Sequence, residues 1–230
     1  MKKSKSIFVI GMVFLFTNAF GQSTELETTK TRNVKRTTQT YFDLMVNGVS
    51  TSINYGASNS AMADYKKSAK GIQAGASFQA GITPAFSLVS EIYYIKKGGT
   101  LTADNPLTGS ESNFRFNALE LPLLARFHTG RFYMNAGPSI AYMLSGNRKT
   151  NDQTTKLSFG NSSEGFKRLD AGIQMGGGFE FPLNQKRIAL DIRYVYGLTN
   201  IANGNDMHNR TLMVSVYFSK LWKTNPFGRS

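Results

Sequence analysis

Apolar and polar residues alternate along most of this chain with the two-residue period of β-strands. The pattern is clearest over residues 71–97, where a single interruption at Thr83 and Pro84 separates two alternating runs. This stretch therefore predicts two strands joined by a very short turn, which is a β-hairpin. Six further segments show the same period, so we expect eight strands in all. They are residues 42–50, 71–82, 86–97, 113–127, 131–144, 167–181, 187–196 and 210–221.

The connections between these strands alternate strictly between short and long. Short turns are expected at residues 83–85, 128–130 and 182–186. Long polar loops are expected at residues 51–68, 98–112, 145–165 and 197–209. This alternation is typical of outer-membrane barrels, which have short periplasmic turns and long external loops. It predicts an all-β fold, an eight-stranded antiparallel up-and-down transmembrane β-barrel over residues 41–222, with both termini in the periplasm.

A soluble ligand-binding barrel of the lipocalin type shows the same alternation with its apolar face turned inward, so the period alone does not separate the two. Side-chain size does, because the interior of an eight-stranded barrel is just wide enough for side chains to fill. The polar face of the predicted strands is the small one, with residues such as Gly75, Ser77, Gly137 and Gly176. We therefore expect the bulky apolar face to point outward, toward lipid.

Large aromatic residues on the apolar face gather at the two ends of the predicted strands. Tyrosines fall at the loop ends and phenylalanines at the turn ends. Such sorting is typical of the two interfacial girdles of a membrane barrel, and the ordinary β-propensity of aromatic residues does not account for it. The expected aromatic girdle consists of Phe86, Tyr94, Phe127, Phe132, Tyr142, Phe181, Tyr194, Tyr196, Phe218 and Trp222.

The first 22 residues have the organisation of a secretory signal peptide. Basic residues precede an apolar run over residues 7–16, which is too short to span a membrane, and small and polar residues follow. We expect cleavage after Gln22, then a flexible periplasmic tail over residues 23–40, and a short C-terminal tail over residues 223–230. The chain contains no cysteine, so we expect neither a lipid anchor at this site nor a disulfide.

The polar face places charged residues inside the predicted barrel. Folding the chain about the turn at residues 182–186 sets Glu180 opposite Arg187 and Gln174 opposite Arg193. Because unpaired charges in so narrow a lumen are costly, we expect a plugged, ion-paired interior in place of a water-filled pore. The alternative is that some of these groups, such as Arg126 and Arg168, reach water at the rims. The expected interior ion-pair network is Glu91, Glu120, Arg126, Asp170, Glu180, Arg187, Asp191 and Arg193.

The chain is basic, with 27 Lys and Arg against 14 Asp and Glu, and removal of the three lysines of the signal peptide leaves 24 basic residues and a net charge of +10. A basic surface attracts phosphate groups. For an exported protein we expect these to belong to outer-membrane lipids and lipopolysaccharide, and we expect no nucleic-acid partner. The alternative is plain solvated charge. The candidate lipopolysaccharide contacts lie in or beside the external loops: Lys66, Lys67, Lys96, Lys97, Arg148 and Lys149.

Five segments of the chain resemble the PorT-like family of small outer-membrane β-barrels from Gram-negative bacteria, within the outer membrane protein beta-barrel domain. The resemblance covers roughly residues 42–221. It implies an integral outer-membrane location and, for PorT itself, a part in protein secretion across that membrane. It brings no catalytic residues. The segments are FSLVSEIYYIKKGG from Phe86, LELPLLARF from Leu119, FYMNAGPSIAYML from Phe132, DAGIQMGGGFEF from Asp170 and IALDIRYVYGLTNI from Ile188.

Residues for enzymatic chemistry are few. Of the two histidines, His128 falls in a predicted periplasmic turn, which leaves His208 beside Asp206 as the one candidate base. Two histidines at opposite ends of a barrel do not build a zinc site. We therefore expect no enzyme activity, no metal and no cofactor. The candidate nucleophiles for the contrary case are the loop serines Ser145, Ser162 and Ser163.

Three functions follow from the sequence. The first is a structural or interaction protein that binds a partner or lipopolysaccharide through its external loops. The second is an accessory component of a protein secretion machine, as the resemblance to PorT implies. The third is a rim enzyme acting on lipid or peptide through His208.

Overall fold

The structure is a computed structural model that describes residues 40–151, 153–183 and 186–221. The expected signal peptide, nearly all of the expected N-terminal tail, the C-terminal tail and Trp222 lie outside the described residues. The described part of the chain is almost entirely β, with two short 3-10 helices. None of its helices is long and apolar enough to cross a membrane.

Eight long strands form the wall of the molecule, and a short ninth strand, β6, extends one of the hairpins. The helices η1 (Gly56–Asn59) and η2 (Ala63–Tyr65) lie between the first two strands. The strands are β1 (Tyr41–Asn54), β2 (Lys66–Thr83), β3 (Phe86–Leu101), β4 (Ser112–Thr129), β5 (Phe132–Thr150), β6 (Gln153–Lys156), β7 (Leu169–Leu183), β8 (Lys186–Gly197) and β9 (His208–Leu221).

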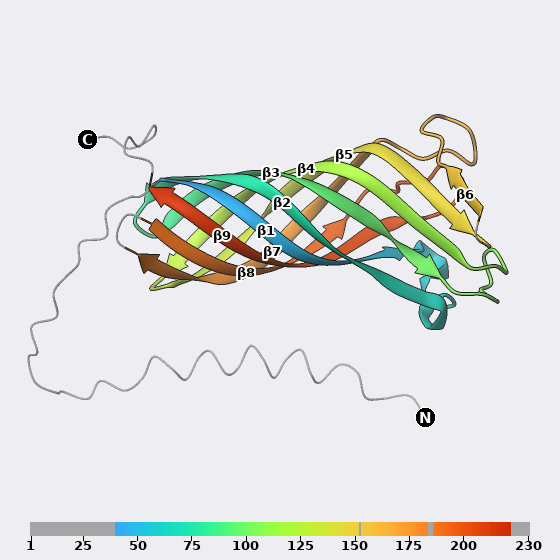
Figure 1. Cartoon of the computed structure of the whole chain (residues 1–230), viewed down its shortest axis with the longest axis horizontal. Coiled ribbons are helices and arrows are strands. Elements are labelled where there is room, and N and C mark those ends of the chain that lie inside the picture. The colour runs from blue at the N-terminus through green and yellow to red at the C-terminus, as the bar shows by residue number, and fades with distance from the viewer. Residues whose placement is uncertain (1–39, 152, 184–185, 222–230) are drawn as a thin grey trace, which may run out of the picture. The chain divides into compact units, whose positions relative to one another are not determined.

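The wall is a closed antiparallel sheet. Each long strand pairs with the next one along the chain, β5 pairs with β7, and β1 pairs with β9 from Tyr41↔Leu221 to Asn54↔His208. Figure 1 shows the result as a cylinder of tilted strands. The predicted eight-stranded up-and-down antiparallel barrel is confirmed, and β6 is an addition that pairs with the end of β5.

Seven of the eight long strands are longer than the sequence analysis predicts, β7 has the predicted length of 15 residues, and the short turns are tighter. Two residues connect β2 to β3, β4 to β5 and β7 to β8. We call this end of the barrel the turn end, on the left in Figure 1, and the opposite one the loop end. At the loop end, β2 begins at Lys66 and β5 continues to Thr150, so parts of the predicted loops are strand. His128, expected in a turn, belongs to β4.

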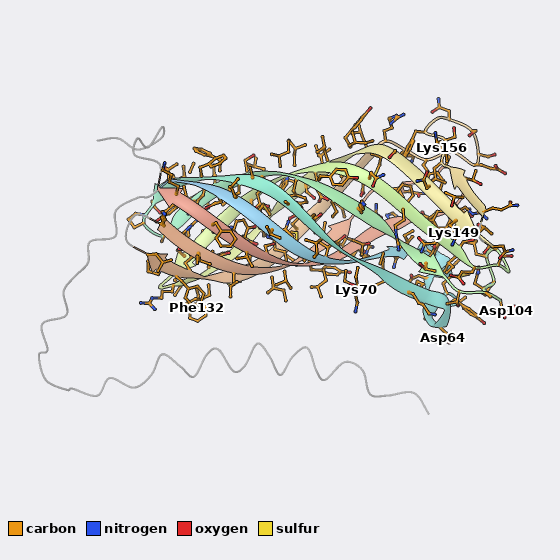
Figure 2. The ribbon with its side chains drawn as sticks, in the orientation of Figure 1. Asp64, Lys70, Asp104, Phe132, Lys149 and Lys156 are labelled. Atoms are coloured by element: carbon orange, nitrogen blue, oxygen red, sulfur yellow. The ribbon has the colours of Figure 1, made fainter. Side chains whose placement is uncertain are left out.

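The outward face of the wall carries a band of exposed apolar side chains that begins at the turn end, which we call the membrane belt. A lipid-facing barrel wall has such a band. Figure 2 shows these side chains pointing away from the ribbon, with Phe132 at the turn end. Representative members are Leu44, Val46, Ile92, Leu121, Leu123, Ile140, Ile173, Leu190, Ile192 and Val214.

The polarity of the two faces reverses along the same strands. Within the belt, β4 turns leucines such as Leu121 outward and buries Glu120 and Arg126. Nearer the loop end, its outward residues are polar, and Phe114 and Phe116 are buried instead. The outward polar residues of this part are Asn113, Arg115 and Asn117. Near the turn end, the wall is therefore apolar outside and polar inside, as in membrane barrels. Near the loop end, it is polar outside and apolar inside, as in soluble proteins.

An apolar core fills the interior at the loop end, and we call it the apolar cap. The loop residue Phe166 lies against the wall, with its ring centroid 5.3 Å from that of Phe116 and 6.2 Å from that of Phe114. Ile201 joins the same core, and its N–H donates to Met207 O at 2.9 Å. The cap is formed by Ile53, Tyr55, Met62, Leu101, Phe114, Phe116, Met143, Phe166, Ile201 and Met207.

Candidate functional site

Charged side chains occupy the interior between the turn end and the apolar cap. Every Asp and Glu of the eight long strands points inward, where these residues meet four cations. The alternation of the strands brings them there, because each occupies an inward position of its strand. They form a central, a loop-side and a turn-side cluster. The inward charges are Asp43, Glu91, Glu120, Asp170, Glu180 and Asp191, with Lys97, Arg126, Arg187 and Arg193.

Arg193 is the focus of the central cluster. Its two terminal nitrogens each lie 2.9 Å from an oxygen of Glu91, and its Nε donates to Asp191 Oδ1 at 2.7 Å. Tyr217 OH donates to Glu91 Oε1 at 2.9 Å, and Asn135 Nδ2 donates to Asp191 Oδ2 at 2.8 Å. All of these side chains are buried. A bidentate salt bridge of this kind is the strongest arrangement of a guanidinium and a carboxylate.

Lys97 is the focus of the loop-side cluster. Its Nζ lies 2.9 Å from Glu120 Oε2 and 3.0 Å from Asp170 Oδ2. Gln174 connects this cluster to the central one, since its Nε2 donates to Glu120 Oε1 at 2.9 Å and its Oε1 accepts from Arg193 Nη1 at 3.2 Å. The two clusters therefore form one continuous hydrogen-bonded network.

Arg187 is the focus of the turn-side cluster. Its Nη1 contacts Glu180 Oε1 at 2.5 Å, and its Nη2 lies 3.4 Å from Asp43 Oδ1. Ser219 accepts a hydrogen bond from Arg187 Nε at 3.0 Å and donates one to Asp43. The guanidinium also stacks 3.9 Å from the ring centroid of Tyr41. The buried cation thus has partners on every side.

Arg126 is buried, and its contacts are with an amide and an aromatic ring. Within the described residues no carboxylate lies at ion-pair distance from it, and its Nη1 donates to Gln79 Oε1 at 2.8 Å, an oxygen that also accepts from Arg187. Its guanidinium lies 4.1 Å from the ring centroid of Tyr133. The alternative that Arg126 reaches water is wrong, because its side chain is fully buried, whereas Arg168 is exposed at the loop end.

Two glycines of β7 make room for these large side chains. A Cβ on Gly176 would lie 2.6 Å from Arg193 Cγ, and one on Gly178 would lie 2.4 Å from Tyr133 OH. The nearest atoms would be backbone oxygens of β8, Ile192 O at 2.1 Å from the first Cβ and Leu190 O at 2.2 Å from the second, so a larger residue would displace the neighbouring strand as well as these side chains. The lumen is so narrow that residues without a side chain are needed in β7 beside Arg193 and Tyr133.

The register of the β7–β8 hairpin differs by two residues from the prediction. Pro182 faces Arg187, whereas the sequence analysis places Glu180 opposite Arg187 and Gln174 opposite Arg193. The connecting turn has only two residues, which shifts the pairing. A shift of two keeps every side chain on its face of the sheet, so both predicted contacts form diagonally.

The interior network contains two charges that the sequence analysis does not include. Asp43 lies between the outward Phe42 and Leu44 of β1, and Lys97 is in step with Glu91 along β3. The two-residue alternation alone places both of them on the inward face. Lys97 was expected among the lipopolysaccharide contacts, and that assignment is wrong, because the side chain points into the lumen and is 2% exposed.

The other candidate lipopolysaccharide contacts lie at different places near the loop end. Lys66 Nζ donates to Asn59 Oδ1 at 2.5 Å, and partial burial lowers the pKa of this lysine. The guanidinium of Arg148 lies 5.7 Å from the ring centroid of Phe114, over the apolar cap. Lys67, Lys96 and Lys149 are exposed.

A model of the family described as outer membrane protein beta-barrel domain matches residues 44–203, which is more than half of the chain. The chain belongs to this family. The barrel is accordingly an outer-membrane protein, and the closer resemblance to PorT stays a prediction. No curated protein matches the chain by sequence.

Solved outer-membrane barrels are similar to this family member in fold. Neisserial surface protein A is 11% identical with a TM-score of 0.44, and the match covers 79% of this chain and 96% of that one. OprG of Pseudomonas aeruginosa is 11% identical with a TM-score of 0.43, covering 82% and 99%. Ail of Yersinia pestis is 10% identical with a TM-score of 0.42, covering 79% and 98%.

The predicted girdle residues lie on the outward face of this outer-membrane barrel, apart from Trp222, which is not among the described residues. Neighbouring phenylalanines pack at the turn end, with ring centroids 4.9 Å apart for Phe86 and Phe127. Toward the loop end, Tyr94 OH donates to Asn117 Oδ1 at 2.8 Å. An aromatic body with a polar tip is suited to the boundary between lipid and water.

The candidate base of a rim enzyme lies at the loop end. His208 Nε2 is 3.5 Å from Asp206 Oδ1. Among the described residues, no serine hydroxyl is hydrogen-bonded to His208, and Ser145 Oγ accepts instead from Asn117 Nδ2 at 2.8 Å. No three His, Asp or Glu side chains in the described ranges are placed to hold a metal ion. In the described ranges, the geometry therefore brings together an imidazole and a carboxylate without a hydrogen-bonded serine.

Proposed function

We propose that this outer-membrane barrel is a sealed structural and interaction protein whose loop end faces the outside of the cell and binds its partners. The observation that carries the proposal is the filling of the lumen by two layers in series. Around Arg193 it is filled by a buried ion-paired network, and beyond that network by the apolar cap. An eight-stranded barrel leaves little further space.

The central cluster supports a closed state. Opening a path for water past Arg193 requires separating it from Glu91 and Asp191, its contacts at 2.7 to 2.9 Å. Leaving one partner of a buried ion pair without the other costs about 3–5 kcal/mol. At that cost the open form is rare at equilibrium, so we expect a barrel that does not conduct ions.

The apolar cap supports a role for the loop end in binding. It holds the connections in place from inside, and polar contacts hold them from outside, as when Asn203 Nδ2 donates to Gly160 O at 2.6 Å and to Ser162 O at 2.9 Å. A surface that is already ordered loses less entropy when a partner binds. The short turns at the opposite end favour placing the loop end outside the cell.

Planar-bilayer recording tests the sealed state. The unaltered full chain, reconstituted in a bilayer, should show no steady conductance. Glu120→Ala should introduce a leak, because it removes one partner of Lys97 and the acceptor of a Gln174 hydrogen bond in the loop-side cluster. A steady, large conductance from the unaltered barrel would contradict the proposal.

The resemblance to PorT supports a second candidate, an accessory component of a protein secretion machine. The two candidates predict different partners at the loop end. Crosslinking of intact outer membranes through an exposed residue such as Lys156, which Figure 2 shows at that end, followed by purification, separates them. Secretion-machine subunits in the product favour the second candidate, and lipid or another surface protein favours the first.

A further inference from the structure

Charge is sorted between the two faces of the barrel wall. All Asp and Glu residues of the eight long strands point inward, whereas every charged residue on the outward face of these strands is a cation. Ordinary soluble surfaces mix both signs. Within the described strands, an outward cation therefore has no carboxylate beside it on its own face of the wall.

Three of these outward cations lie on consecutive strands, and we call them the basic strip: Lys70 of β2, Lys96 of β3 and Arg115 of β4. Lys96 pairs with Asn117 and Gly98 pairs with Arg115, so Lys96 and Arg115 are diagonal neighbours on one face. Diagonal neighbours lie roughly 7–8 Å apart. Lys70 is in the stretch of β2 between Ser68 and Gly75 where the β2–β3 register shifts.

The basic strip has no acidic partner within the part of the chain that the structure describes. None of its three residues forms an ion pair there, and Arg115 makes only a long hydrogen bond, 3.4 Å, to the carbonyl of Phe114. Two like charges at this spacing repel each other. An anion that contacts two or three of them at once removes the repulsion.

The basic strip lies where the membrane belt ends. On β3, Lys96 follows Tyr94 by two residues on the same face, and on β2, Lys70 follows the exposed Ile72 in the same way toward the loop end. Figure 2 shows Lys70 pointing away from the wall. Asn117 accepts from Tyr94 and donates to Ser145, which forms a polar row beside the strip. Tyrosines and polar residues at the end of an apolar band are typical of the level of lipid head groups.

We propose that the basic strip binds the phosphate groups of lipid A, the glycolipid of the outer leaflet. The proposal rests on the orientation given under the proposed function, which places the strip in that leaflet. A guanidinium contacts two phosphate oxygens at once, and the two lysines, on the neighbouring strands β3 and β2, add point charges on one side of it. The lipid phosphate supplies the counter-charge that the wall lacks, and the strip fixes lipid A beside strands β2 to β4.

Lipid binding to the detergent-solubilised full chain, measured by native mass spectrometry, tests the proposal. Lipid A should remain bound, and lipid A stripped of its phosphates should not. The variant Lys70→Gln, Lys96→Gln, Arg115→Gln should bind lipid A on the order of 100-fold more weakly. Equal retention of lipid A and phosphatidylglycerol by the unaltered chain would overturn the assignment to lipid A.

A matched control removes the same charge from the turn end. The variant Arg131→Gln, Lys186→Gln, Lys220→Gln also loses two lysines and one arginine, all of them exposed. It should bind lipid A as the unaltered chain does. If both triple variants lose the same affinity for lipid A, the lipid is attracted by net charge alone. That result would overturn the basic strip as a site.

A second measurement needs no substitution. In vesicles of phosphatidylcholine with lipid A, Lys70 and Lys96 should be protected from a water-soluble acetylating reagent at least about tenfold relative to vesicles without lipid A, while Lys156 of β6 should react equally in both. If each of the three lysines is acetylated equally fast with and without lipid A, the proposal is contradicted. This result does not depend on whether the triple variant folds.

Protease treatment of whole cells separates this proposal from the orientation on which it rests. Cleavage at the loop end, after Lys67 or Lys156, supports the orientation; if lipid A then fails to bind, only the basic strip is overturned. Cleavage confined to the turn end would overturn the orientation and the outer-leaflet assignment together.

Discussion

Around Arg193 the barrel interior consists of ion pairs and hydrogen bonds, whereas around Phe116, in the same wall, it consists of packed apolar side chains. The solvent outside the wall explains the difference. Within the membrane belt, the apolar side chains of each strand face lipid. Because side chains alternate between the two faces, the polar ones face the narrow interior. Beyond the belt, water surrounds the wall, and the hydrophobic effect again favours an apolar interior. One sheet thus follows two opposite rules of patterning.

The largest effect is expected in the charged interior. Arg193→Ala leaves Glu91 and Asp191 buried without their cation, which should lower the free energy of unfolding by about 3–5 kcal/mol. Urea unfolding in detergent micelles, followed by circular dichroism, measures it. The variant Glu91→Gln, Asp191→Asn, Arg193→Gln removes the charges together and should recover most of the loss. If it is as unstable as Arg193→Ala, volume and not charge balance holds this region together.

A smaller effect is expected on the outward face, where the two regions meet different solvents. Ile192→Arg places a charge on the belt and should cost about 2–4 kcal/mol in lipid vesicles, because the side chain faces hydrocarbon. Gln153→Arg, on the exposed strand β6 beyond the belt, should change stability by no more than about 0.5 kcal/mol. Similar costs at both positions would refute the change of environment along the wall.

The smallest effect is expected in the apolar cap. Ile201→Val removes one methylene group from a side chain that is 1% exposed, and such changes cost about 0.5–1.5 kcal/mol. The same unfolding measurement applies, and Leu198→Val on the exposed surface is the matched control, with no measurable change expected. If Ile201→Val also leaves the free energy of unfolding unchanged, the cap is not a packed core.

The sequence predicts the membrane part of the barrel well, since the belt and the inward charges share one alternation. The cap is missed because the alternation changes sense in mid-strand. In β4, the apolar positions are Phe114, Phe116 and Ala118 before the change, and Leu119 and Leu121 after it. The predicted strand at residues 113–127 contains both sets, but the sequence analysis assigns only the second set, to the outward face, and so predicts no apolar core inside. The switch of parity is visible in the sequence and coincides with the end of the membrane belt on β4.

Partners inside the lumen are harder to predict than its composition. Because the side-chain period is two, the sequence leaves the register of a hairpin undetermined by multiples of two, and the β7–β8 pairing differs from the prediction by that amount. Contacts across the lumen, such as Arg193 with Glu91 of β3, depend on the closure and tilt of the whole barrel. No local pattern specifies them.

The pairing of β1 with β9 has a consequence for biogenesis. These strands are the first and last of the barrel, so their ladder can form only after the rest of the chain has been made and delivered. Until then, both strands present unpaired backbone groups, which hydrocarbon does not tolerate. The chain therefore has to enter the membrane nearly complete, with its two ends brought together as the final step, and a version truncated before His208 would have no membrane-inserted form.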